Sequence, residues 1–147
     1  LNAFIAQNYG AGRNDRVRKG YKASLWTVGI WGLLISAVFI CVPEPIARIF
    51  FHEPAAIATA VEYLIIIGFS EAFMCVELTT VGALSGLGRT RLCSIISIAF
   101  TSARIPLAII LGGIMGLNGI WWALSSTSIV KGIIFTCTFL WITRKRK

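Results

Sequence analysis

The sequence predicts an all-α protein: a polytopic bundle of transmembrane helices with four full spans and the end of a preceding helix. Hydrophobic residues make up 56% of the chain and charged residues 14%, which is far more apolar than an ordinary soluble domain. A spanning helix needs roughly 20 mostly apolar residues, and four such runs occupy residues 23–42, 61–84, 92–112 and 119–143. Because these runs are long and continuous rather than short and alternating, they favour helices over the strands of a β-barrel.

The segments around the first span predict shorter helices. Residues 1–8 read as the end of a helix already in the bilayer, so we expect a chain that opens at Leu1 to be part of a larger protein. The basic segment 14–22 is expected to begin an interfacial helix, with Tyr21 at headgroup depth and anionic membrane lipid as its partner. Pro43 ends the first span, residues 46–50 should lie flat on the membrane, and Pro54 begins the next helix.

The distribution of charge predicts the orientation of the chain. The formal net charge is +8, and the loops on one side of the predicted membrane hold most of the 14 basic residues. Excess Lys and Arg in short loops is typical of the cytoplasmic side. We therefore expect a multi-pass protein of the inner (plasma) membrane with a cytoplasmic C-terminus, the loop at His52 outside, and no nucleic-acid partner. The basic residues on the predicted cytoplasmic side are Arg13, Arg16, Arg18, Lys19, Lys22, Arg89, Arg91, Arg144, Lys145, Arg146 and Lys147.

Four charged residues fall inside the predicted spans: Glu71, Glu77, Arg104 and Lys131. An ionisable side chain at the bilayer centre costs at least ~2.5 to 3.5 kcal/mol, so it normally faces a partner or a wet cavity. Counted from the inner ends of their spans at ~1.5 Å per residue, Glu71, Arg104 and Lys131 lie roughly 20 Å deep and Glu77 roughly 13 Å deep. Equal depth predicts an intramembrane network in which Glu71 pairs with Arg104 or Lys131, with Arg104 preferred.

Glu77 is the candidate ion-coupling residue. At its own depth the sequence offers it no cation, and a buried carboxylate in that position can take up a proton or Na⁺. The hydroxyls of Thr79 and Thr80 follow it closely and could supply further oxygen ligands. The alternative is that Glu77 stays protonated and hydrogen-bonds a neighbouring helix. Pro106, near Arg104, is expected to kink the third span.

Nothing in the sequence predicts an enzyme, a metal site or a cofactor. The four cysteines lie in apolar stretches, without a C-x-x-C pair or a cluster of His and acidic residues at ligand spacing, so we interpret them as apolar filler. No nucleophile with an adjacent base and no phosphate-binding loop is recognisable. The cysteines are Cys41, Cys75, Cys93 and Cys137.

Four short motifs occur in order along the chain and resemble those of one transporter family. Residues 7–12 read QNYGAG, residues 82–90 read GALSGLGRT, residues 104–107 read RIPL and residues 116–121 read GLNGIW. They are similar to the Q-N-x-G-A-G, G-A-x-x-G-x-G-x-T, R-x-P-L and G-x-x-G-x-W segments of the multidrug and toxic compound extrusion (MATE) transporters. Each motif alone is weak, whereas their order and spacing together are specific.

The resemblance implies a twelve-helix exporter of two six-helix lobes that exchanges cationic or amphipathic compounds for Na⁺ or H⁺ by alternating access. Residues 1–147 would then be a partial C-terminal lobe, from the end of the eighth helix through the twelfth, and the N-terminal lobe would be its partner. The acid that several members carry in the tenth helix is replaced here by Met74, whereas Glu77 resembles the Glu of another branch with an E-x-T-T-x-G-A pattern. The acid that a further branch carries in its first helix would belong to the missing lobe.

Two other functions stay open at this point. A lipid-linked saccharide flippase of a related exporter family would show a basic, hydrated cavity in the missing lobe. A membrane scaffold or truncated remnant without transport activity would have no such lobe encoded upstream. The sequence favours secondary active export of small organic, often cationic, compounds, with Na⁺ or H⁺ as the coupling ion and no other cofactor.

Overall fold

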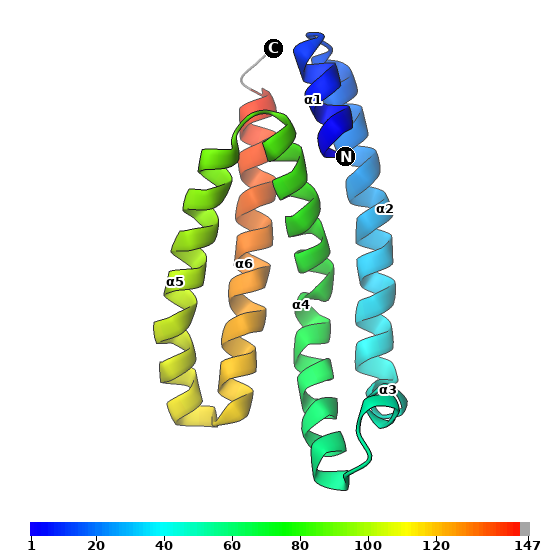
Figure 1. The fold of residues 1–147 in the computed structure, drawn as a ribbon, viewed down its shortest axis with the longest axis vertical. Helices are drawn as coiled ribbons and strands as arrows, with labels where there is room; N and C mark the ends of the chain where they lie inside the picture. The colour runs from blue at the N-terminus through cyan, green and yellow to red at the C-terminus, as the bar shows by residue number, and fades with distance from the viewer. Residues whose placement is uncertain (145–147) are drawn as a thin grey trace.

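The computed structural model describes residues 1–144, which form six helices in the order in which Figure 1 colours them. The Lys147 terminus, and with it part of the predicted basic tail, lies outside the described residues. Four helices are long and apolar enough to cross a membrane, as the sequence predicts. The helices are α1 (Asn2–Gly10), α2 (Asn14–Cys41), α3 (Pro43–Phe50), α4 (Pro54–Gly86), α5 (Thr90–Met115) and α6 (Leu117–Arg144).

The short helices around the first span are mostly those predicted. The opening helix α1, the short α3 and the start of α4 at Pro54 confirm the sequence prediction. The helix predicted to begin in the basic segment 14–22 does begin at Asn14, and it continues without a break through the first span to Cys41 as α2. No proline interrupts this stretch, so nothing prevents the helical hydrogen bonds from continuing into the span. The third span likewise continues through Pro106 as one helix.

The long helices stand side by side in a single row, in the order α5, α6, α4 and α2 (Figure 1). α4 packs against α2 on one side and against α6 on the other, and α5 packs mainly against α6. A single row leaves broad apolar surfaces uncovered, and α5 alone exposes Ile95, Ile98, Ile105 and Ile109. Such surfaces suit lipid or the further helices of a longer protein.

The glycine-rich segment at the end of α4 packs closely against α1. A Cβ atom on Gly86 would lie 2.7 Å from the backbone oxygen of Asn2, so a larger residue would push the two helices apart. Gly88, with φ of 73°, then turns the chain from α4 into α5 in a conformation that side chains disfavour. The cluster of buried hydrophobic side chains lies at this end of the helices, around Ile5, Leu84 and Phe135.

Candidate functional site

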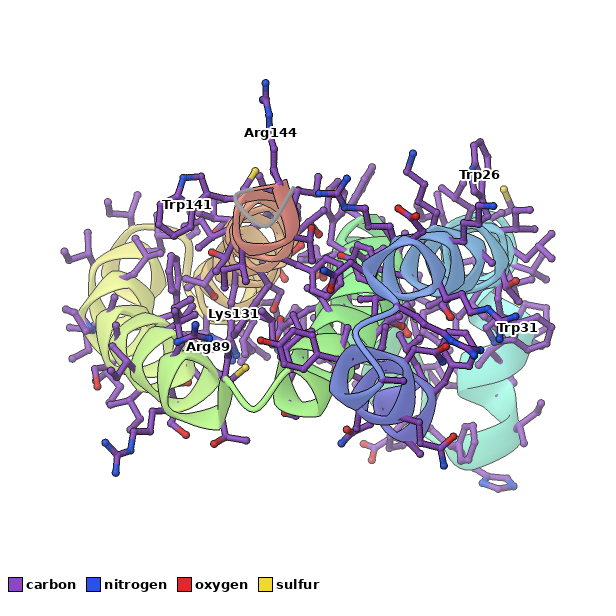
Figure 2. All side chains as sticks on the ribbon, turned by 90° about the horizontal axis from the view of Figure 1, so that it is seen from above. Trp26, Trp31, Arg89, Lys131, Trp141 and Arg144 are labelled. Atoms are coloured by element: carbon purple, nitrogen blue, oxygen red, sulfur yellow. The ribbon has the colours of Figure 1, made fainter. Side chains whose placement is uncertain are left out.

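An ion pair joins α4 and α6 inside the row of helices. The ammonium of Lys131 lies 2.8 Å from a carboxylate oxygen of Glu77, and each side chain is only 13% exposed. The same ammonium lies 5.9 Å from the centre of the Phe135 ring, which is within the range of a cation–π contact. Figure 2 shows Lys131 in the interior of the row rather than at its edge. Glu77, which was expected to lack a cation at its own depth and so to have no fixed partner, is therefore paired with Lys131.

The register of α4 against α6 explains how the two charges meet. The hydroxyl of Ser125 donates to the carbonyl of Ile66, and a Cβ on Gly132 would lie 2.8 Å from the carbonyl oxygen of Phe73. Both contacts pair residues at the same separation in sequence, so Lys131 lies about five residues, or ~7.5 Å at ~1.5 Å per residue, from the level of Glu77. The predicted depths were thus consistent with this offset. A lysine side chain is long and flexible enough to span most of this offset along the helix axis. Because the sequence prediction paired only residues at equal depth, it did not consider Lys131 as a partner of Glu77.

The rotation of α4 about its axis decides which acid faces α6. At about 100° per residue, Glu77 lies only about 40° from Phe73, which touches α6. Glu71 lies about 160° from Phe73 and so points almost directly away from α6. It shares that side with Cys75, whose thiol lies 3.8 Å from the Glu71 carboxylate. α2 packs against this side, because a Cβ on Gly32 would lie 3.4 Å from the Cβ of Cys75.

Arg104 is held by hydroxyl groups of α6 rather than by an acid. Its Nε donates to Thr127 at 2.9 Å and one terminal nitrogen donates to Ser128 at 3.2 Å. Within residues 1–144 it forms no ion pair, and Glu71 forms none either. The predicted network of Glu71, Arg104 and Lys131 is therefore wrong. α6 stands between α5 and α4 (Figure 1), and the helical spacing turns Glu71 away from α6.

The two threonines that follow Glu77 point to different surroundings. The Thr79 hydroxyl donates to the carbonyl of Cys75 at 2.9 Å, and its side chain lines a cavity of about 530 Å³ between α1, α2 and α4. The buried Thr80 hydroxyl donates to the carbonyl of Val76 and lies 2.8 Å from the hydroxyl of Tyr21. In the part of the chain that the structure describes, neither hydroxyl is hydrogen-bonded to the Glu77 carboxylate. The structure thus brings Lys131, and not the threonines, to Glu77.

Tyr21 is a buried structural residue, a role that the sequence analysis did not predict. It is 1% exposed, and its ring lies 3.8 Å, centre to centre, from that of Phe139 on α6. Through its contacts with Thr80 and Phe139, Tyr21 links α2, α4 and α6 near the end of the helices at which α6 terminates. The spacing of Val17 and Tyr21 with Leu25, one apolar residue per turn, was the signal for a buried face.

The geometry gives Glu77 and Lys131 a defined chemical capability. A carboxylate in a poorly hydrated setting needs a positive charge beside it, and Lys131 supplies that charge from a flexible side chain. The charge of Glu77 is therefore neutralised by a side chain of a neighbouring helix.

Comparison with known proteins places these features in a family. Residues 1–110 match the MatE family. The chain belongs to the MATE family. It is 28% identical over 149 aligned residues to a protein of Pseudomonas aeruginosa named "Probable multidrug resistance protein NorM". It is also 27% identical over 147 aligned residues to the protein of the same name from Thermotoga maritima.

These matches cover 96% and 95% of this MATE chain but only 30% and 31% of the length of the two relatives. The chain thus spans about a third of the proteins that it resembles. The four helices long enough to cross a membrane fit a multi-pass membrane protein of this family.

Proposed function

We propose that this chain is part of the C-terminal lobe of a secondary active antiporter that exports small organic, often cationic, compounds in exchange for Na⁺ or H⁺. Membership of the MATE family and the multidrug resistance names of two relatives support this class of activity. They favour a transporter over an enzyme. The observation that carries the proposal for this lobe is the buried pair of Glu77 and Lys131 between two helices that touch along their length.

In this proposal Glu77 is the ion-coupling carboxylate of the lobe and Lys131 is its resident cation. When no free cation is bound, the ammonium neutralises the carboxylate, so the buried charge is never left alone. A proton or Na⁺ arriving at Glu77 takes over that role and releases Lys131. Because the side chain of Lys131 belongs to α6 and Glu77 to α4, its release changes what holds the two helices together. This couples occupancy of the carboxylate to the packing of the lobe.

The orientation is part of the same proposal. The turn between α4 and α5 and the end of α6 face the cytoplasm of the inner membrane, and the loop at His52 faces outward. The basic residues near those two ends support this placement.

Gradient-driven efflux by the full-length protein tests the proposal. Glu77→Gln keeps the shape of the neutral acid but cannot release a proton or carry charge to a cation, so at equal amounts of folded protein in the membrane it should lose efflux driven by a Na⁺ or proton gradient. Glu77→Asp should retain part of that efflux. Glu71→Gln is the matched control, because this acid lies on the same helix and forms no ion pair within residues 1–144. Efflux by this variant should stay near that of the unmodified protein. Undiminished gradient-driven efflux by Glu77→Gln would refute the role of Glu77.

A further inference from the structure

A basic cleft of about 450 Å³ opens between the start of α2 and the end of α6, at the end of the helices where the chain's basic segments gather. It is separate from the Glu77–Lys131 pair and has no part in the proposed ion exchange. One wall is the first two turns of α2 and the other is the last turns of α6. The cleft is lined by Asp15, Arg18, Lys19, Tyr21, Lys22, Phe139, Leu140, Thr143 and Arg144.

The sequence spacing places these side chains on facing surfaces. Arg18 and Lys19 each lie three or four residues from both Asp15 and Lys22, so the four side chains share one face of α2. Arg18 closes the inner part of the cleft, because one of its terminal nitrogens donates a hydrogen bond to the carbonyl of Thr143 on α6. An arginine has five N–H donors in a fixed fork. The contact with Thr143 therefore leaves donors of Arg18 available to a ligand.

The cleft has a strong excess of positive charge. Four cationic side chains and one carboxylate line it, a net formal charge of +3. Within residues 1–144 none of these cations lies within 4 Å of an acidic group, because the ion pairs there are Glu77 with Lys131 and Glu44 with Arg48. The cations repel one another, and an anion between them would relieve that repulsion.

The surroundings of the cleft match the position of a lipid headgroup. Below it, α2 turns an apolar surface outward, with Trp26 74% exposed and Ile30 55% exposed, and Trp141 on α6 is 58% exposed. Tryptophan at this level is typical of the boundary between headgroups and acyl chains. Figure 2, which looks along the helices onto this end, shows Arg144 and Trp26 projecting from the same side of the row.

We propose that this cleft binds the phosphate of an anionic phospholipid from the leaflet at this end of the helices. The phosphate oxygens would accept charge-assisted hydrogen bonds from Arg18, Lys19, Lys22 and Arg144. The acyl chains would run along the exposed apolar surface of α2 beside Trp26. Phosphate suits this site because arginine and lysine donors bind its several oxygens together.

Lipid binding to the full-length protein in detergent micelles, counted by native mass spectrometry, tests the proposal. The probes are dioleoyl phosphatidylglycerol, which is anionic, dioleoyl phosphatidylcholine, which has the same chains but no net charge, and inorganic phosphate. The unmodified protein should retain phosphatidylglycerol at least tenfold more tightly than phosphatidylcholine. Each cation that contacts the phosphate contributes at least about a fivefold change in affinity, so Lys19→Gln with Lys22→Gln should weaken phosphatidylglycerol binding roughly 25-fold. Binding of phosphatidylcholine, whose choline offsets the phosphate charge, should weaken less.

The matched control is Arg89→Gln with Arg91→Gln, which removes the same charge from exposed positions around the start of α5, outside the cleft. It should change phosphatidylglycerol binding less than threefold. Arg144→Gln is an independent variant and should cost about fivefold. Equal losses in the cleft variant and the control would assign the binding to diffuse surface charge and overturn the proposal. Displacement of the lipid by an equimolar amount of inorganic phosphate would assign the cleft to the free ion instead. Because this is a binding measurement, it can fail without bearing on the proposed transport.

Discussion

Replacing one member of the buried ion pair should lower the free energy of unfolding far more than replacing both. Glu77 and Lys131 are each 13% exposed and their charged atoms lie 2.8 Å apart. Removing one partner of such a pair leaves a buried charge uncompensated, at a cost of about 3 to 5 kcal/mol. Glu77→Gln and Lys131→Met keep the side-chain volumes nearly constant, so the double variant loses the charges without creating a cavity.

The expected coupling energy follows from the surroundings of the pair. Two unit charges about 4 Å apart attract by ~4 kcal/mol at an effective dielectric constant of ~20, but by only ~1 kcal/mol in water. After the cost of desolvation is subtracted, we expect the double variant to lose less unfolding free energy than the two single variants lose in sum, by about 2 kcal/mol or more. The measurement is equilibrium unfolding of the full-length protein in mixed detergent micelles, analysed as a double-mutant cycle.

A second ion pair in the same chain provides the control. Glu44 and Arg48 lie 2.6 Å apart on α3, and their side chains are 57% and 66% exposed. Glu44→Gln with Arg48→Gln should give a coupling energy below about 0.5 kcal/mol, because water screens an exposed pair within one helix. If the losses of Glu77→Gln and Lys131→Met simply add, the pair does not act as a unit and the proposed exchange of cations loses its basis.

Three further predictions concern packing and orientation. Arg104→Met should lower the unfolding free energy by about 1.5 to 3 kcal/mol, because it removes charged hydrogen bonds to two hydroxyls of α6. Glu71→Gln should change the unfolding free energy by less than about 0.5 kcal/mol. Equal losses in the two variants would favour the original prediction that Arg104 pairs with Glu71. Gly132→Ala should cost about 1 to 3 kcal/mol in the same measurement, because the new Cβ would lie 2.8 Å from a carbonyl of α4. Its control is Gly29→Ala, which meets nothing within 4 Å and should be neutral or slightly stabilising. His52→Cys in an otherwise cysteine-free full-length protein should react with an impermeant thiol reagent added outside, and protection there would reverse the proposed orientation.

The sequence alone determined the helices and the family. Continuous apolar runs have the length of a membrane span whatever they pack against, so all four spans could be predicted, and Pro54 marked the beginning of a helix correctly. The glycine-rich motifs likewise carried the family resemblance, and within them a close helix contact at Gly86 and positive φ angles at Gly12, Gly88 and Gly116 favour glycine. The charged residues inside the spans could also be picked out, since few such residues are tolerated in lipid.

Only the tertiary structure decided which of those charges meet. Depth along a helix can be counted from the sequence, but the rotation of α4 about its axis cannot, and that rotation turns Glu77 toward α6 and Glu71 away from it. The order of the helices in the row was equally invisible, and it gives Arg104 the hydroxyls of α6 as partners. A pairing between helices depends on register, rotation and side-chain reach together, and these are fixed by contacts such as that of Gly132 with α4, which no single helix encodes.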